Sequence, residues 1–278
     1  MSNRIYRAGQ ALRRGLVAFA AMAAAVALFR FALLPLLQAA LAADDVTMTV
    51  LRRSGTFACA LLGYWASARF HEKRPVDELR LAPLGMLLGA LSGALLISVT
   101  TLSLFASGNC EALAFRGAGG VLDIGSAILL AAMLEELVFR GLLFRALEHV
   151  GGTTAALVVQ SLVFALMHSS NDGANATMIV MVTLIGAFWT CLYIVWRNLW
   201  VVALNHAAWN FAIFFTGVPL SGMTEWRASA PFDSVCRGPD WMTGGAFGPE
   251  NSVVTLVTMT LCLVLLVRRA QRQNRFVS

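Results

Sequence analysis

Residues 175–216 read NATMIVMVTLIGAFWTCLYIVWRNLWVVALNHAAWNFAIFFT, and Arg197 is the only Asp, Glu, Lys or Arg among them. A helix that crosses a bilayer needs about 20 mainly apolar residues. The stretch supplies two such lengths, which meet at Arg197-Asn198. It therefore predicts two consecutive membrane helices, 175–196 and 198–216.

The rest of the chain has the same character. Of its 278 residues, 58% are hydrophobic and 13% are charged, and the mean hydropathy is +0.72. Soluble domains carry about 25% charged residues, and much of their surface must face water. This composition excludes a water-soluble enzyme, a disordered chain and a free nucleic-acid-binding domain. Six more apolar runs bring the total to about eight spans: 15–37, 54–70, 82–106, 119–147, 153–169 and 251–267.

Short loops between most runs favour antiparallel neighbours. We therefore expect an all-α, polytopic membrane helix bundle in which residues 1–278 form a single integral membrane domain. Its motif-bearing core would be 119–216, and the polar segment 217–250 would be an ordered outer loop or cap. Trp226 and Trp241 in that loop either lie on the membrane surface or cover the interior of the bundle.

Basic residues set the orientation of the bundle. With about eight spans, fourteen Lys and Arg residues fall on one side and five on the other, and the richer side is normally cytoplasmic. Both termini are therefore expected in the cytoplasm. Arg far outnumbers the single Lys73, and no retention or transit signal is visible. Together with the compact chain, these traits predict a multi-pass protein of a bacterial plasma (inner) membrane.

The start of the chain has two interpretations. The triplet Ala40-Leu41-Ala42 has the small residues of a signal-peptide cleavage site. However, the preceding apolar run is longer than a signal peptide needs, and Arg30 interrupts it. We expect the first run to remain as a membrane helix.

The five cysteines form no metal-binding pattern. Cys59, Cys191 and Cys262 lie in apolar runs and are expected to pack there. Cys110 and Cys236 fall in loops on the same outer side. They form either a disulfide or two free thiols.

Ionisable residues inside the spans point to function, because each costs several kcal/mol near the bilayer centre. The fourth span carries Glu135-Glu136-x-x-x-Arg140. The fifth ends in Phe164-x-x-x-His168, and the seventh contains His206-x-x-x-Asn210. At 1.5 Å per residue, Glu135, His168, His206 and Asn210 fall within about 10 Å of one depth. They predict one polar chamber inside the bundle.

Helical spacing assigns partners within this chamber. Glu136 and Arg140 are four residues apart and share a face, so they are expected to pair. Glu135 is rotated by about 100° and faces elsewhere. Arg140 is expected to stabilise the ionised form of Glu136. Desolvation makes it easier for Glu135 to hold a proton, so Glu135 is expected to act as a base that takes a proton from water. Such a base beside His168 could activate water, and His206 with Asn210 could stabilise an oxyanion.

The three motifs resemble the signature of the CPBP family, the intramembrane glutamic endopeptidases related to CAAX prenyl proteases and to bacterial Abi immunity proteins. The resemblance covers about 131–211, in matching order. It implies that Glu135 and His168 activate water and that His206 and Asn210 form the oxyanion side. Glu136, Arg140 and Phe164 would support them, and no cofactor is needed.

Other functions remain open at this point. Zinc held by Glu135, His168 and His206 is a minority alternative, although the chain has no H-E-x-x-H motif. The same polar cluster would also suit a membrane transporter or a non-catalytic immunity or scaffold protein. As an endopeptidase, the protein would act on a peptide or membrane-protein substrate within the lipid bilayer. The sequence specifies neither the substrate nor the oligomeric state.

Overall fold

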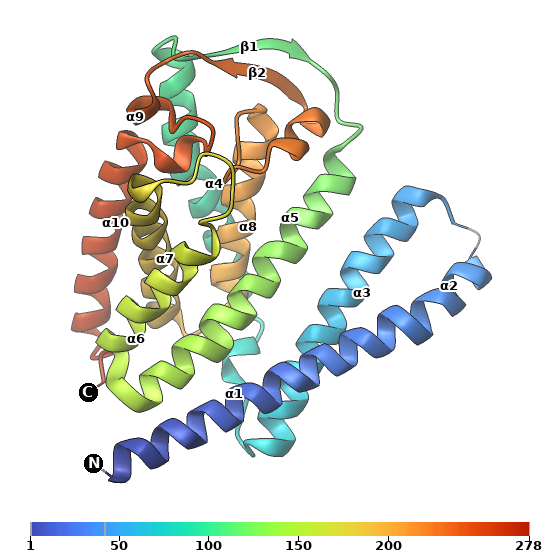
Figure 1. The fold of residues 1–278 in the computed structure, drawn as a ribbon, viewed down its shortest axis with the longest axis vertical. Helices are drawn as coiled ribbons and strands as arrows, with labels where there is room; N and C mark the ends of the chain where they lie inside the picture. Colours follow the sequence, from blue (N-terminus) through green and yellow to red (C-terminus); the bar gives the residue numbers. More distant parts are fainter. Residues whose placement is uncertain (1, 42, 278) are drawn as a thin grey trace.

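The computed structural model describes residues 2–41 and 43–277, and in it long helices run between two ends of the molecule (Figure 1). Both chain termini lie at one end, and a two-stranded ribbon lies at the other. The long helical segments are α1–η1–α2 (Ser2–Leu28, Phe29–Leu33, Leu34–Leu41), α3–η2 (Asp45–Ala66, Ser67–His71), α4 (Pro83–Ala106), α5–η4 (Val121–Glu136, Leu137–Phe144), α6 (Arg145–Met167), α7 (Ala176–Trp196), α8 (Leu199–Thr216) and α10 (Val253–Arg272). The short elements are η3 (Asp77–Leu79), β1 (Cys110–Phe115), η5 (Thr224–Ser229), β2 (Phe232–Cys236), α9 (Asp240–Thr243) and η6 (Pro249–Asn251).

Helices cover all eight apolar runs. Among the described residues, five helical segments are long and apolar enough to cross a membrane: Ile5–Leu41, α4, α7, α8 and α10. Arg52 and Arg53 interrupt the apolar sequence of α3, α5 has 16 residues before η4 begins, and α6 is divided by the non-helical Gly152. The protein is thus a helical membrane protein, while the full count of eight spans stays a prediction. Ala42, the last residue of the cleavage-like triplet, lies outside the described residues.

Local sequence explains where the helices around the core begin. Asn175 and Asn198 cap α7 and α8, each accepting a hydrogen bond from a backbone N–H three residues on. Between these helices Arg197 adopts a left-handed conformation, with φ of 47°. The tight turn makes α7 and α8 antiparallel neighbours, as their sequence predicts.

A stripe of small residues lets α4 approach α8 closely. Gly85, Gly89 and Gly93 recur every four residues on the buried face of α4. A Cβ atom on Gly93 would lie 2.0 Å from the carbonyl oxygen of Asn205, and one on Gly89 would lie 2.5 Å from that of Val201. This close crossing fixes the position of α8, which carries the third motif.

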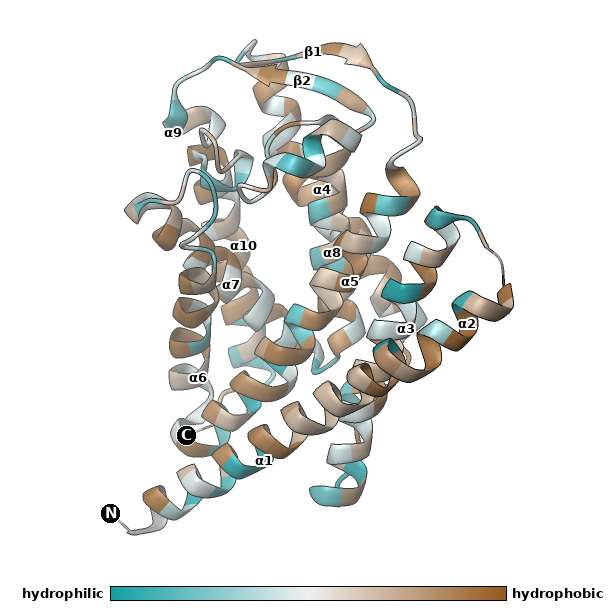
Figure 2. Ribbon diagram, turned by 45° about the vertical axis from the view of Figure 1, so that its right-hand side comes forward, coloured by the Kyte–Doolittle hydropathy of each residue, from teal (hydrophilic) through white to brown (hydrophobic). Residues whose placement is uncertain are grey.

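Apolar side chains cover the outside of the bundle. On α4, for example, Leu84 is 69% exposed and Leu95 is 67% exposed. In Figure 2 most helical residues are coloured hydrophobic, and many hydrophilic residues gather toward the ends of the molecule. Such a surface suits hydrocarbon rather than water.

The ribbon end is held by a disulfide. Cys110 and Cys236 are bonded, and β1 pairs with β2 in antiparallel register. The sequence left this pairing open, and it showed no strand pattern there. The expected cap at 217–250 therefore contributes one strand, β2, to a β-ribbon. The sequence did not predict this ribbon because strands this short lack a periodic signal. Disulfides persist in oxidising compartments, which agrees with an outer location for this end.

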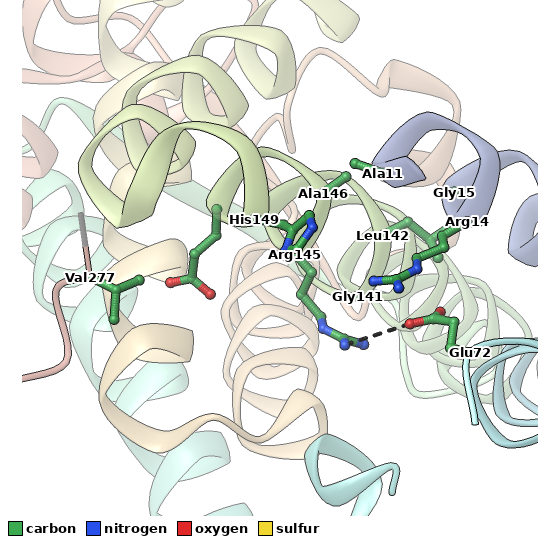
Figure 3. A pocket seen from close by; sticks show the side chains of 11 residues that line it. Ala11, Arg14, Gly15, Glu72, Gly141, Leu142, Arg145, Ala146, His149 and Val277 are labelled. Atoms are coloured by element: carbon green, nitrogen blue, oxygen red, sulfur yellow. Dashed lines mark ion pairs between the residues drawn. The ribbon is translucent and has the colours of Figure 1, made fainter. Parts of the chain in front are cut away.

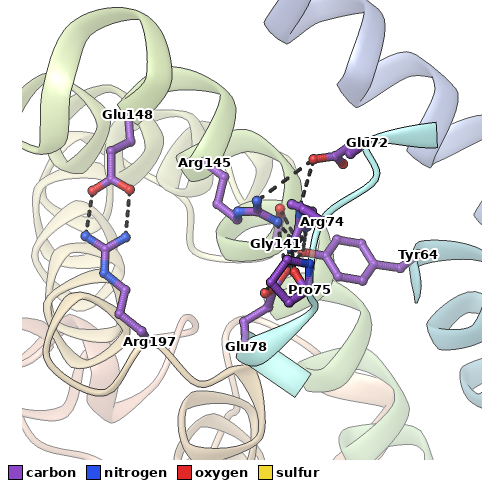
Figure 4. Close-up of polar contacts among 9 residues, drawn as sticks. All are labelled: Tyr64, Glu72, Arg74, Pro75, Glu78, Gly141, Arg145, Glu148 and Arg197. Carbon is purple, nitrogen blue, oxygen red and sulfur yellow. Dashed lines mark hydrogen bonds and ion pairs between the residues drawn. The ribbon is translucent and has the colours of Figure 1, made fainter. Parts of the chain in front are cut away.

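The opposite end is joined by ion pairs between segments far apart in the sequence (Figure 4). Glu78 accepts hydrogen bonds from Tyr64 and from Arg145, the latter at 2.7 Å. Arg197 binds both carboxylate oxygens of Glu148, at 2.6 and 2.7 Å. These contacts tie α3 and the start of α6 to the end of α7.

Substituting Gly93→Ala should destabilise the protein by about 1–3 kcal/mol, because a buried methyl group would force α4 away from α8. The measurement is the thermal unfolding midpoint in detergent. Gly15→Ala on α1 is the matched control, since a Cβ there meets nothing within 4 Å. Equal midpoints for both variants would contradict the close crossing.

The ribbon end should lie on the outer, non-cytoplasmic face of the membrane. In intact cells, a membrane-impermeant maleimide should label the Cys110→Ser variant, which frees Cys236, but not the wild-type protein. Cys59→Ser is the control, because it leaves the disulfide intact. If Cys110→Ser is labelled only after the cells are broken, this end lies in the cytoplasm.

Candidate active site

All three motif-bearing segments contribute to one cavity of about 330 Å³. Its lining includes Glu135 from α5, Phe164 and His168 from the end of α6, and His206 and Asn210 from α8. Residues of the 217–250 segment close its outer end, and Trp226 is among them. Trp241, by contrast, is 64% exposed. The predicted polar chamber is present, and one of the two outer tryptophans covers it.

The innermost contact is an ion pair between Glu136 and Arg140. Immediately after Glu136, α5 passes into the π-helical segment η4, an irregularity that often marks functional sites. The Arg140 guanidinium donates to Glu136 Oε1 at 2.9 Å and to the Gly186 carbonyl at 2.9 Å. The two side chains are 1% and 0% exposed. The i,i+4 pair expected from the sequence is therefore formed and buried.

His206 connects this pair to the cavity. Its Nδ1 lies 2.9 Å from Glu136 Oε1, and its Nε2 lies 3.9 Å from Glu135 Oε2. A carboxylate oxygen accepts hydrogen bonds, so this short contact places a proton on Nδ1. The imidazole also stacks on Trp189, with ring centroids 3.7 Å apart. Its position is thus fixed from two sides.

Glu135 and Asn210 present unpartnered polar atoms. The Glu135 side chain is 33% exposed, and its buried Oε2 has no hydrogen-bond partner among the described residues. The same holds for Oδ1 of Asn210. Glu135 faces the cavity while Glu136 faces Arg140, as the rotation between neighbouring residues predicts. Unsatisfied polar atoms in a cavity suggest groups that bind water or substrate.

The tautomer of His168 follows from its one hydrogen bond. Nδ1 lies 2.9 Å from the carbonyl oxygen of Phe164. A carbonyl only accepts, so Nδ1 carries the proton, and Nε2 of the neutral ring is left with a lone pair. The Phe164 ring packs against His168, with centroids 4.8 Å apart, and under the Arg140 guanidinium. Phe164 thereby forms a wall beside the His168 imidazole.

The structure adds a third carboxyl group that sequence reasoning missed. Glu250 lines the same cavity from the 217–250 segment and is 4% exposed. It accepts hydrogen bonds from Trp209 Nε1, at 3.1 Å, and from the Ser221 hydroxyl. Burial raises the pKa of Glu250 above its ordinary value. In the sequence it is one acid in a polar loop, and nothing there distinguishes it from a surface residue.

A second cavity, of about 390 Å³, lies at the Arg-rich end (Figure 3). Arg14, Glu72, Arg145, Glu148 and His149 line it, but none of the motif residues does. Both of its acids are already paired with arginines. Its charges are largely balanced, so it offers no comparable chemistry.

The residues of the candidate site do not form a metal centre as they stand. Among the described residues, no three His, Cys, Asp or Glu side chains are grouped to hold an ion. His206 Nδ1 already contacts Glu136, and His168 Nδ1 contacts a carbonyl. Only the Nε2 atoms of the two rings are free of these contacts. Imidazoles held in this way through Nδ1 can act through Nε2 either as acid–base groups or as metal ligands, and only the lack of a tight three-residue grouping among the described residues favours the first role.

Replacing Arg140 with Met should cost about 3–5 kcal/mol of stability, because Glu136 would be left as a buried, unpaired charge. Adding Glu136→Gln should recover most of the loss. Thermal unfolding in detergent measures both effects. Arg237→Met is the control, because its ion pair with Glu111 joins side chains that are 71% and 65% exposed. A similar loss in the control would show that burial of the pair is unimportant.

Comparison with known proteins agrees with the motifs. Residues 117–212 match the family model described as type II CAAX prenyl endopeptidase, Rce1-like. No curated protein and no solved structure matches the chain. The matched region covers about a third of the sequence, from just before α5 into α8, and contains all three motifs. Through this region the chain is similar to the type II CAAX prenyl endopeptidases of the CPBP (CAAX protease) family.

Proposed function

We propose that the protein is an intramembrane endopeptidase that hydrolyses a peptide bond with a glutamate-activated water. The observation that carries the proposal is the contact of His206 with both glutamates, 2.9 Å to Glu136 and 3.9 Å to Glu135, at the wall of the cavity. Acid, imidazole and amide groups meet there, and the one serine among the described lining residues, Ser221, donates its hydroxyl to Glu250. Such a set supports direct attack by water.

Glu135 is the general base in this proposal. Its free Oε2 accepts a proton from a water molecule in the cavity, and the lone pair on His168 Nε2 holds the same water by accepting its second hydrogen. The hydroxide then attacks the carbonyl carbon. Arg140 and Glu136 do not react. They remain a neutral pair, which leaves Glu135 as the carboxylate directed to the cavity.

His206 and Asn210 stabilise the negative charge that develops on the carbonyl oxygen. In this role Nε2 of His206 donates while Nδ1 contacts Glu136, so the imidazole carries a proton on each ring nitrogen in the reactive state. The Asn210 amide donates from the next turn of the same face of α8. Donors that are already oriented stabilise an oxyanion strongly in a water-poor site.

The substrate is proposed to be a peptide or membrane protein that reaches the cavity from the bilayer or from the outer end. The matching family is named for prenylated substrates, but prenylation of this protein's substrate is not required by the site. The orientation expected from the Arg residues puts the capped end on the outer face of a bacterial inner membrane. No nucleic-acid partner is proposed.

Glu135→Gln should abolish cleavage, with a loss of at least about 100-fold, because general-base catalysis contributes on this scale. Membrane proteomes of cells that express wild-type or variant protein identify the substrate. A quenched fluorescent peptide built on the cleaved sequence, with protein in phospholipid vesicles, then gives the rate. Glu111→Gln is the control, since Glu111 lies on the outer ribbon with a side chain that is 65% exposed. Full activity of Glu135→Gln would exclude its role as base.

The same preparation separates the alternatives. A transporter would give Glu135-dependent solute flux into vesicles without proteolysis. A scaffold or immunity protein would keep its cellular function after the loss of Glu135, His168 and His206 together. Inactivation by a chelator, with about one zinc per chain in the purified protein, would favour a metal mechanism.

A further inference from the structure

Peptide hydrolysis needs a proton for the leaving amine, and among the motif residues only Glu135, after it has taken a proton from water, could supply one. In the proposed reaction Glu135 takes a proton from water and His206 is engaged by the oxyanion. Glu136 is held by Arg140 and His206. An amide nitrogen is a poor leaving group until it is protonated. The question is which group in the cavity carries that proton.

Glu250 differs from the other two carboxyl groups in its surroundings. Glu136 has an arginine at 2.9 Å, and Glu135 is one-third exposed. Glu250 is nearly fully buried, and its hydrogen-bond partners are the neutral groups of Trp209 and Ser221. Without a paired cation, burial favours its neutral, protonated form.

The elements packed around Glu250 add little compensating charge. Its own segment η6 contacts α4, α7, α9 and α10. No Asp, Glu, Lys, Arg or His occurs in α4, in α7 or in residues 253–267 of α10, and α9 contributes Asp240. From the cavity side it faces His168 and His206, which favour ionisation but do so less strongly than burial opposes it. Glu135 lines the same cavity.

We propose that Glu250 is the general acid of the peptidase, donating its carboxyl proton to the leaving amine from the cap side of the cavity. This inference rests on the proposed function. When the carbon–nitrogen bond breaks, the bonding pair goes to nitrogen, which takes the proton of Glu250. The products are a carboxylic acid and a free amine. The proton that Glu135 took from water returns to Glu250 through water, which restores both groups.

The location of Glu250 gives the 217–250 segment a chemical role besides covering the site. The segment is joined to the ribbon, which is closed by the Cys110–Cys236 disulfide. Ser221, from the same segment, holds one oxygen of Glu250, and Trp209 of α8 holds the other. The cap and the membrane helix α8 therefore both hold the carboxyl group of Glu250 in place.

The test compares a peptide with its thioester analogue at the scissile position. A thiol, with a pKa of about 8.5, leaves as a thiolate and needs no proton. Glu250→Gln keeps the shape and both hydrogen bonds, with its carbonyl facing Trp209 and its amide facing Ser221. It should lower kcat for the peptide by about 10²–10⁴-fold. The thioester should be hydrolysed about as fast as by the wild type.

The pH profile gives an independent readout. A general acid must be protonated, so wild-type activity should fall as pH rises through the raised pKa of Glu250. The Glu250→Gln variant should lack this fall. Glu111→Gln serves as the control for both measurements, and unfolding midpoints show that the variants are folded.

Each other outcome overturns the assignment. Equal losses for peptide and thioester would mean a structural or binding role for Glu250. Unchanged peptide cleavage would mean no role at all. If wild-type protein cleaves neither compound, the proposed peptidase function itself fails, which is distinguishable because every variant is then equally inactive.

Discussion

The buried Glu136–Arg140 pair is the contact on which the rest of the site depends. Neither charge can be solvated by lipid, and removal of either partner leaves the other unpaired. Through Gly186 and the rings of Phe164 and Trp189, Arg140 connects α5 with α6 and α7. Through Glu136 the pair also positions His206 on α8. The contacts of this one ion pair thereby link four helices, α5, α6, α7 and α8.

This arrangement explains how two adjacent glutamates acquire different environments. Glu136 faces the interior, where an arginine and an imidazole share its Oε1 atom. Glu135 faces the cavity, with an oxygen free for water. The division needs only the helical rotation between neighbours and one arginine four residues on. A third carboxyl group, Glu250, enters from outside the membrane helices and has no arginine. Three glutamates thus have three electrostatic settings: Glu135 and Glu250 line the cavity, and Glu136 lies behind His206.

The cap and the opposite end of the protein are built differently. At the capped end, a disulfide and a short ribbon hold polar loops over the cavity. At the Arg-rich end, ion pairs such as Glu148–Arg197 join the helices. This difference agrees with a protein whose two ends face compartments of different redox state and charge.

Helix positions and motif pairing could be predicted from the sequence because both are local. Apolar runs of about 20 residues specify membrane helices, and four-residue spacing specifies the Glu136–Arg140 pair. That Glu135, His168, His206 and Asn210 line one cavity was also predictable, since depth in the membrane follows from helical rise. The β-ribbon, the choice to pair Cys110 with Cys236, the contact of His206 with Glu136 and the burial of Glu250 depended on tertiary structure. Each joins residues 70 or more positions apart in sequence or, for Glu250, a loop to a distant helix. Helical periodicity carries no information about such distances, because they are set by how the helices pack and by where the loop between them folds.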